Sequence, residues 1–107
     1  MSLLEDLNIP ASLKNALAEN HLVRATPIQQ KVFSPVLAGK DVCGIAQTGT
    51  GKTIAYLLPL LKLWKFSAEK YATILILVPT RELVVQVEET IKELTPYMSV
   101  KALGVYG

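Results

Sequence analysis

The sequence has very little of what secreted and membrane proteins depend on. Cys43 is its single cysteine, so no internal disulfide and no paired-thiol zinc site can form. The chain starts with an acidic segment, where a secretory signal needs basic and then apolar residues. Its longest apolar run, 54–64, contains Pro59 and Lys62 and is too short to span a bilayer. These absences predict an intracellular protein in a reducing compartment, with the cytoplasm as the first expectation and the nucleus as the alternative.

Strong charge and abundant aromatic residues are missing as well. Eleven Lys and Arg against nine Asp and Glu give a formal net charge of +2, and aromatic residues make up 7% of the chain. A mild basic excess is compatible with an anionic partner but is weak evidence for nucleic acid. Half of the 107 residues are hydrophobic and 19% are charged, which is typical of one globular domain with a core.

Hydrophobic spacing predicts two helices at the N-terminal end. A first short helix follows Pro10, with its apolar residues at helical spacing. Thr26 suits the N-cap and Pro27 the first helical position, so a second helix is expected over 28–37 and should end at Gly39.

The rest of the chain alternates between strand and helix patterns. Short apolar runs rich in β-branched residues are followed by amphipathic stretches, and the links between them are short. This order predicts an α/β fold, with an open parallel sheet that carries helices on both faces. Three parallel strands make a thin sheet, so we expect a truncated domain. We expect strands at 41–46, 73–78 and 100–106, and helices at 52–65, with a kink at Pro59, and from residue 81 onward.

The strongest local signal is the glycine-rich run at 46–53. Gly49 and Gly51 let backbone N–H groups surround phosphate oxygens. Lys52 supplies charge to the β- and γ-phosphates of a nucleotide, and the Thr53 hydroxyl can ligate Mg²⁺. An ordinary β–α turn with an incidental lysine is the alternative. We assign nucleotide binding to Ala46, Gln47, Thr48, Gly49, Thr50, Gly51, Lys52 and Thr53, with Lys52 and Thr53 as the catalytic pair and Thr53 as the residue that meets Mg²⁺ bound with ATP.

Three segments together resemble the DEAD-box ATP-dependent RNA helicases. The sequence Ala-Thr-Pro-Ile-Gln at 25–29 is similar to the family's Q motif, and the glycine-rich run is similar to motif I. Pro-Thr-Arg-Glu-Leu at 79–83 is similar to motif Ia, and 104–107 resembles the start of the glycine-doublet segment. The resemblance implies the N-terminal part of the first RecA-like P-loop NTPase domain. It divides the chain into a Q-motif region, 1–38, and a P-loop β-α-β-α-β portion, 39–107.

The Q-motif resemblance implies that Gln29 reads adenine. A carboxamide offers one donor and one acceptor edge, which match the N6 amine and N7 of that base. Arg24 matches the basic position of the motif, and Leu22 stands where the family usually has an aromatic residue against the base. The alternatives are an exposed polar residue on a helix for Gln29 and a solvated surface charge for Arg24.

Pro79, Thr80 and Arg81 directly follow the expected central strand, at the edge of the sheet where open α/β folds bind ligands. The resemblance implies that these residues and Gly107 contact the sugar–phosphate backbone of RNA. Such contacts carry no base information, so RNA binding should be independent of sequence. A simple N-cap is the alternative for Thr80.

The implied function is the ATP-binding portion of an ATP-dependent RNA helicase, which couples ATP hydrolysis to unwinding or remodelling of RNA duplexes. ATP, Mg²⁺, RNA and the remainder of the helicase core are the expected partners, with no membrane. A non-enzymatic nucleotide- or RNA-binding module and an unrelated P-loop kinase or GTPase are the alternatives. The chain has no Asp-Glu-Ala-Asp run and no second RecA-like domain. We therefore expect these 107 residues alone to be inactive and to fold poorly.

Three further residues receive structural interpretations. His21 has no neighbouring acid or nucleophile in the sequence, so a general-base role is not expected. Cys43 is expected to be a small core residue of the first strand. Trp64 is expected to pack in the core or at its rim.

Overall fold

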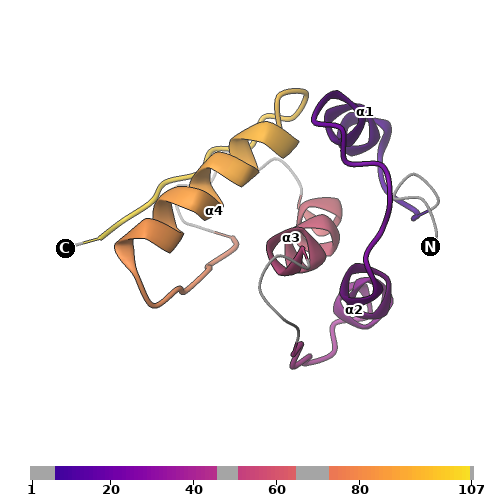
Figure 1. Ribbon diagram of the computed structural model, residues 1–107, viewed down its shortest axis with the longest axis horizontal. Coiled ribbons are helices and arrows are strands. Elements are labelled where there is room, and N and C mark those ends of the chain that lie inside the picture. The colour runs from indigo at the N-terminus through magenta and orange to yellow at the C-terminus, as the bar shows by residue number, and fades with distance from the viewer. Residues whose placement is uncertain (1–6, 46–50, 65–72, 107) are drawn as a thin grey trace.

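The computed structural model describes residues 7–45, 51–64 and 73–106, and the part described contains four helices (Figure 1). They lie where the hydrophobic spacing predicts, although the third helix ends at Leu63 and not at residue 65. Pro59 lies inside this helix, and the kink expected there stays a prediction. None of the helices in these ranges is long and apolar enough to cross a membrane. Their bounds are α1 Ala11–Glu19, α2 Pro27–Leu37, α3 Lys52–Leu63 and α4 Arg81–Leu94.

The first two helices end in the same kind of turn. At the end of α1 the Leu22 N–H bonds to the Leu17 carbonyl at 2.8 Å, and His21 between them has φ 58°. At the end of α2 the corresponding residue is Gly39, with φ 77°. A left-handed residue after the C-cap allows the chain to satisfy the last carbonyls of a helix. Glycine adopts this conformation without steric cost, whereas a histidine does not.

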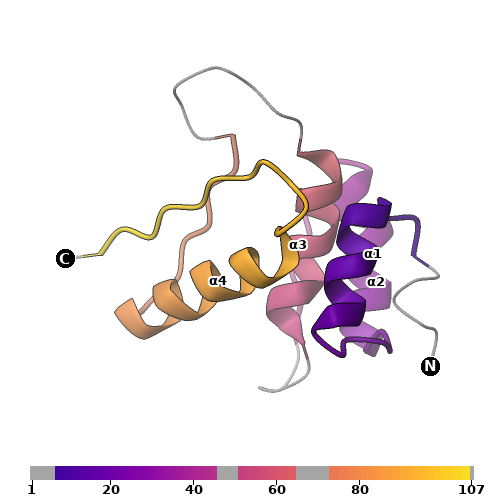
Figure 2. The same ribbon diagram turned by 90° about the horizontal axis from the view of Figure 1, so that it is seen from above.

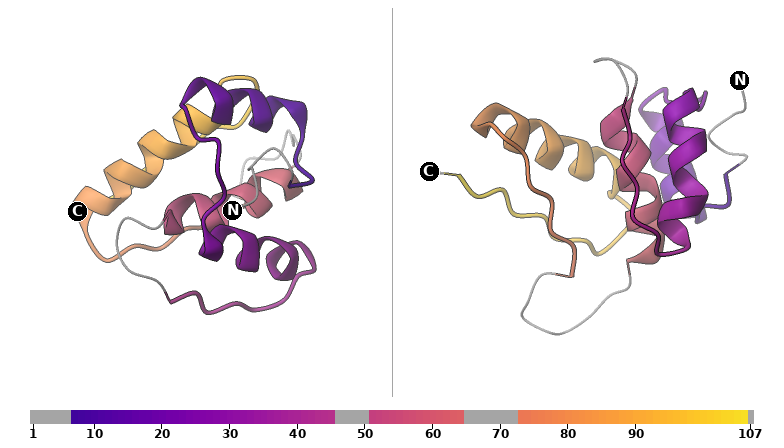
Figure 3. Two further views of the ribbon diagram at one scale, coloured as in Figure 1. Left: turned by 45° about the vertical axis from the view of Figure 1, so that its right-hand side comes forward. Right: turned by 90° about the horizontal axis from the view of Figure 1, so that it is seen from below.

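The core lies between α1, α2, α3 and the C-terminal end of α4. The most extensive helix pairing is between α2 and α3, which lie side by side (Figures 1 and 3). The face that α3 turns inward is continuous and apolar, so this helix supplies more buried leucines than any other described helix. The buried apolar side chains of the core are Ile9, Leu13, Leu17, Ala25, Phe33, Leu57, Leu58, Leu61 and Leu94.

Only part of the apolar stripe along α4 is buried. Val87 and Leu94 are buried, whereas Leu83 near the start of the helix is exposed. The C-terminal end of α4 meets α1, where the Asn20 side-chain amide donates to the Glu93 carbonyl at 3.1 Å. Figures 1 and 3 show the N-terminal end of α4 projecting away from the other three helices.

The predicted strands are not strands within the residues that the structure describes. The segments 41–45, 73–78 and 100–106 run as open chain without a β-ladder (Figure 2). Exposure nevertheless alternates along 73–78, where Leu75 and Leu77 are 78% and 84% exposed and the residues between are half-buried. A period of two indicates strand-like backbone, but a strand exists only when a neighbour accepts and donates its hydrogen bonds. The parallel sheet therefore stays a prediction.

The prediction for Cys43 is wrong. Its side chain is exposed, as are all the residues of 41–45. A core position in a first strand requires cover on both faces. Within the described residues α2 lies against the adjacent Gly44, through Ile28 and Val32, but Cys43 itself stays exposed. Trp64 is half-buried at the end of α3, in agreement with a packing role.

Candidate functional site

Gln29 joins the start of α2 to the start of α3. Its Oε1 accepts a hydrogen bond from the Thr26 N–H at 2.8 Å, while the Thr26 hydroxyl accepts from the Gln29 N–H at 3.4 Å. These reciprocal bonds form a capping box. The Gln29 Nε2 donates to the Gly51 carbonyl at 3.3 Å. Gln29 is only 4% exposed, so the predicted alternative of an exposed polar residue is wrong. Through this bond the Q motif contacts the glycine-rich run directly, at Gly51.

Gly51 is required at this contact for two physical reasons. Its φ of 81° lies in the left-handed region that other residues avoid. A Cβ at this position would also overlap the Gln29 amide nitrogen and lie 3.3 Å from the Gln29 Cδ. The close approach of the two motifs therefore depends on a residue without a side chain.

The N-terminus of α3 is arranged to accept an anion. Gly51 is the N-cap and has no side chain to satisfy the first N–H groups of the helix, and no acidic residue lies in the first turn. Unsatisfied N–H groups and the positive end of the helix dipole attract phosphate oxygens. Lys52 and Thr53 are the first two residues of the helix and are half-buried. The arrangement fits the chemistry predicted for both residues.

The Thr53 hydroxyl also has a neighbour on its own helix. Burial raises the pKa of Tyr56 above its usual value, and a hydrogen bond with Thr53 opposes this rise. A hydroxyl oxygen such as that of Thr53 can also serve as a ligand of Mg²⁺.

Part of the predicted site falls outside the described residues. The structure therefore tests the glycine-rich run only from Gly51 onward. The predicted residues outside the described ranges are Ala46, Gln47, Thr48, Gly49, Thr50 and Gly107.

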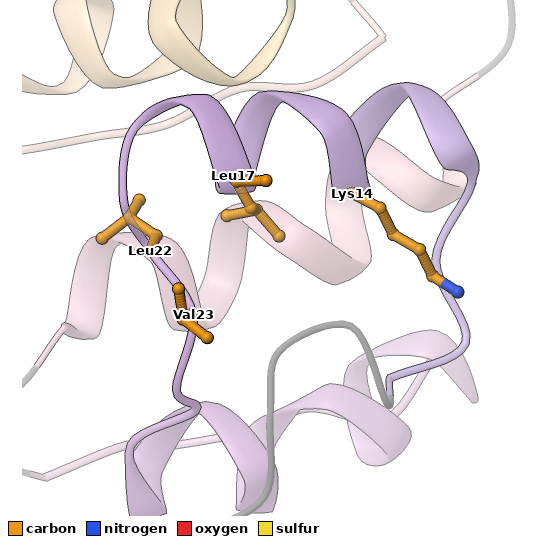
Figure 4. Close-up of a pocket in the computed structure, with 5 residues that line it drawn as sticks. Lys14, Leu17, Leu22 and Val23 are labelled. Atoms are coloured by element: carbon orange, nitrogen blue, oxygen red, sulfur yellow. The ribbon is translucent and has the colours of Figure 1, made fainter.

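Two residues of the predicted base-contacting side lie at or near the surface. Arg24 is exposed, and Leu22 is half-buried beside α1. Leu22 lines a hollow of about 50 Å³, in which Leu17 lies between Leu22 and Lys14 (Figure 4). Pockets that enclose small organic ligands usually measure about 300–1,000 Å³. The hollow by itself is too small for a purine, so it does not identify the base site.

The predicted RNA-contacting residues lie at the exposed start of α4. Pro79, Thr80 and Arg81 are all exposed. The Thr80 hydroxyl accepts from the Leu83 N–H at 3.2 Å, so its predicted role as an N-cap is confirmed. An RNA contact of the same residues stays a prediction.

Tyr106 is a neighbour of Arg81 that no motif predicted. The Arg81 Cζ lies 5.2 Å from the centre of the Tyr106 ring, within the range of a cation–π contact. The C-terminal segment runs back beside α4 toward the start of that helix (Figures 1 and 2). No sequence signal pairs Arg81 with Tyr106, which lie 25 positions apart. The capping box differs, because the Thr-x-x-Gln spacing at 26–29 is a signature from which the contact of Thr26 with Gln29 can be predicted.

Within the described ranges, no cluster of three His, Cys, Asp or Glu side chains could hold a metal ion.

Comparison with known proteins finds relatives over almost the whole chain. The DEAD/DEAH box helicase family matches residues 26–107. The ATP-dependent rRNA helicase RRP3 of Candida glabrata is 42% identical over 94% of this chain and 20% of its own length. The DEAD-box ATP-dependent RNA helicase 3 of Helianthus annuus is 38% identical over 94% of this chain and 46% of its own length. The chain thus spans about a fifth of the first relative and about half of the second.

Solved structures show the same relationship. A DEAD box protein from the hyperthermophile Methanococcus jannaschii superposes with a TM-score of 0.87 and 31% identity, over 98% of this chain and 29% of its own. The RNA-helicase Prp28 from Chaetomium thermophilum, bound to ADP, gives a TM-score of 0.80 and 32% identity, over 100% of this chain and 28% of its own. The fold is thus that of part of a RecA-like helicase domain, and the chain belongs to the DEAD/DEAH box helicase family.

Proposed function

We propose that this chain is the ATP-binding portion of an ATP-dependent RNA helicase, which couples ATP hydrolysis to unwinding or remodelling of RNA duplexes. The observation that carries the proposal is the Gln29–Gly51 hydrogen bond. It brings together two segments, 22 residues apart, that separately match nucleotide-binding motifs of the family. Relatives named as ATP-dependent RNA helicases support the same activity.

Residues 1–38 form the Q-motif region in this proposal, and 39–107 form the P-loop portion of a RecA-like domain with a parallel sheet between helices. The alternating exposure along 73–78 supports a strand with a second apolar face to be covered. The intracellular location expected from the sequence is part of the same proposal.

At the nucleotide, Lys52 binds the β- and γ-phosphates, and the loop from Ala46 to Gly51 surrounds them with backbone N–H groups. Thr53 would hold the Mg²⁺ that accompanies ATP, and the bound ion would supply positive charge beside the phosphates. Gln29 and Arg24 face the base and sugar side. At the other end of the site Pro79, Thr80, Arg81 and Gly107 contact the RNA backbone, so binding is independent of base sequence.

The loop assignment is tested by Lys52→Ala in the intact protein, with ATP binding measured by calorimetry. We expect a loss of affinity of about ten- to a hundredfold, because a charge-assisted contact to phosphate is removed. Lys62→Ala is the matched control, since Lys62 lies at the other end of α3 against the Phe33 ring. ATP affinity that is equal in the two variants would refute the assignment of this loop.

A second measurement separates the helicase from a non-enzymatic binding module. Phosphate release from ATP is followed in the intact protein with and without single-stranded RNA. The helicase proposal expects release that RNA stimulates and that Lys52→Ala abolishes. Tight ATP or RNA binding without any turnover would favour the module instead.

A further inference from the structure

We propose that Tyr106 is a positioning residue for Arg81, and that its ring holds the guanidinium in place for an RNA phosphate. The proposal rests on the proposed RNA contact of Arg81. The Arg81 Cζ lies 5.2 Å from the ring centre, and the two residues come from segments 25 positions apart. The contact is thus made by the tertiary structure and is not a consequence of local helix geometry.

The path of the C-terminal segment fixes which residue faces Arg81. Gly104 is pressed against α4, since a Cβ there would lie 2.9 Å from the Val84 Cγ1 and overlap the Glu88 carboxylate. Val84 and Glu88 share one face of α4 with Arg81, because residues three, four and seven apart line up on a helix. Residues two apart share one side of an extended segment. Close approach at Gly104 therefore places Tyr106 beside Arg81, one turn nearer the start of the helix, in agreement with the contact of the two side chains.

A stacked ring suits the chemistry expected of Arg81. A guanidinium is planar and weakly hydrated, so it can lie on an aromatic face while its edge N–H groups stay directed toward an anion. A long, exposed arginine otherwise loses much rotamer freedom when it binds phosphate. Tyr106 is 53% exposed, so the ring lies at the surface, where a nucleic acid can approach Arg81. The ring thus reduces the entropy lost on binding without contacting the phosphate itself.

The test measures binding of a labelled single-stranded RNA oligonucleotide to the intact protein by fluorescence anisotropy. We expect Tyr106→Leu to weaken binding about two- to fivefold, the size of an exposed cation–π contact. Tyr106→Phe keeps the ring and should bind as the unmodified protein does. In an Arg81→Ala background, Tyr106→Leu should cause no further loss, because the ring acts through the arginine.

Two controls accompany these variants. Tyr97→Leu changes a tyrosine of equal exposure, 53%, at the opposite end of α4, and should leave RNA binding unchanged. ATP binding by Tyr106→Leu should also be unchanged, which shows that the domain is folded.

The outcomes separate the inference from the proposed function. The positioning role is wrong, and the RNA site stands, if Arg81→Ala weakens RNA binding but Tyr106→Leu does not. The same conclusion follows if Tyr106→Leu weakens RNA binding by the same factor in the unmodified protein and in the Arg81→Ala variant. A Tyr106→Phe variant as weak as Tyr106→Leu would also overturn the positioning role. If Arg81→Ala leaves RNA binding unchanged, both the RNA contact of Arg81 and the inference built on it fail.

Discussion

The carboxamide of Gln29 caps one helix and contacts the N-cap of another. Its oxygen accepts from the Thr26 N–H, and its nitrogen donates to the Gly51 carbonyl. An amide oxygen has a second lone pair and an amide nitrogen a second proton, so each atom can still bond to a base. The proposed reading of adenine is therefore compatible with the structural contacts, and both should be lost together when the side chain is removed.

We predict that Gln29→Ala raises the dissociation constant for ATP and lowers the preference for ATP over GTP. A bidentate base contact contributes about 1–3 kcal/mol of discrimination. Loss of the capping box should also lower the free energy of unfolding by about 1 kcal/mol. Nucleotide affinities are measured calorimetrically, and unfolding with urea.

Gln30→Ala is the control, because the Gln30 amide donates to the Ala25 carbonyl at 3.1 Å and does not contact Gly51. An unchanged ATP-to-GTP ratio in Gln29→Ala, together with reduced stability, would show that Gln29 is structural only.

The sequence predicts the chemistry of single residues better than their contacts. The Thr-x-x-Gln spacing identifies the capping box, and the glycine-rich run identifies Lys52 and Thr53. The bond from Gln29 to Gly51 could not be predicted, because it depends on how α2 and α3 pack. The contact of Arg81 with Tyr106 depends on the path of a segment that has no regular structure.

Helix α1 ends at an unusual residue for its turn. His21 occupies the left-handed position that Gly39 occupies after α2. The sequence signalled the second of these ends but not the first, because glycine is the common residue there and histidine is not. The cost of a left-handed conformation at a residue with a Cβ is about 1 kcal/mol or more.

We predict that His21→Gly stabilises the protein by about 0.5–1 kcal/mol. The steric strain that is relieved in the folded state should exceed the extra conformational entropy that a glycine loses on folding. Thermal and urea unfolding of the intact protein measure the change. Gly39→Ala is the matched reverse substitution, at a position where a Cβ would meet no other atom within 4 Å, and it should destabilise by a similar amount. A neutral or destabilising His21→Gly would show that the histidine side chain contributes a contact of its own.

The predicted helices are confirmed and the predicted strands stay predictions, for a physical reason. A helix satisfies its hydrogen bonds within one segment, so capping residues and apolar spacing are enough to place it. A strand satisfies its bonds on a neighbour, so the pattern at 73–78 can be present without a ladder.

At the scale of the whole molecule, the exposed apolar side chains gather on the open segments. Large apolar surfaces of this kind mark places that another part of a protein covers. In the proposed RecA-like domain the sheet and its second layer of helices would cover them. Among the large apolar side chains that the structure describes, the most exposed are Ile45 at 89%, Leu75 at 78%, Leu77 at 84%, Leu103 at 88% and Val105 at 77%.

We predict that Leu77→Lys has opposite effects in two contexts. In the isolated 107 residues it should reduce self-association, measured by light scattering, because it interrupts an exposed apolar surface. In the intact protein it should lower the free energy of unfolding by at least about 2 kcal/mol, since in the proposed parallel sheet a charge would replace a leucine that a layer of helices covers. Leu63→Lys, at a site 50% exposed on α3, is the control. If the intact protein tolerated both equally, residues 73–78 would not be a central strand.

The Gln29–Gly51 bond has a further consequence for the order in which the molecule folds. It closes a span of only 22 residues, whereas the Asn20–Glu93 bond between α1 and α4 closes one of 73. Loop closure costs more entropy over longer spans, and local contacts speed folding. We therefore expect α2 and α3 to associate before α4 docks, so that the two halves of the proposed nucleotide site meet early. Folding kinetics of Leu58→Ala and Leu94→Ala test this order: the first should slow folding and the second mainly accelerate unfolding, and the reverse pattern would contradict it.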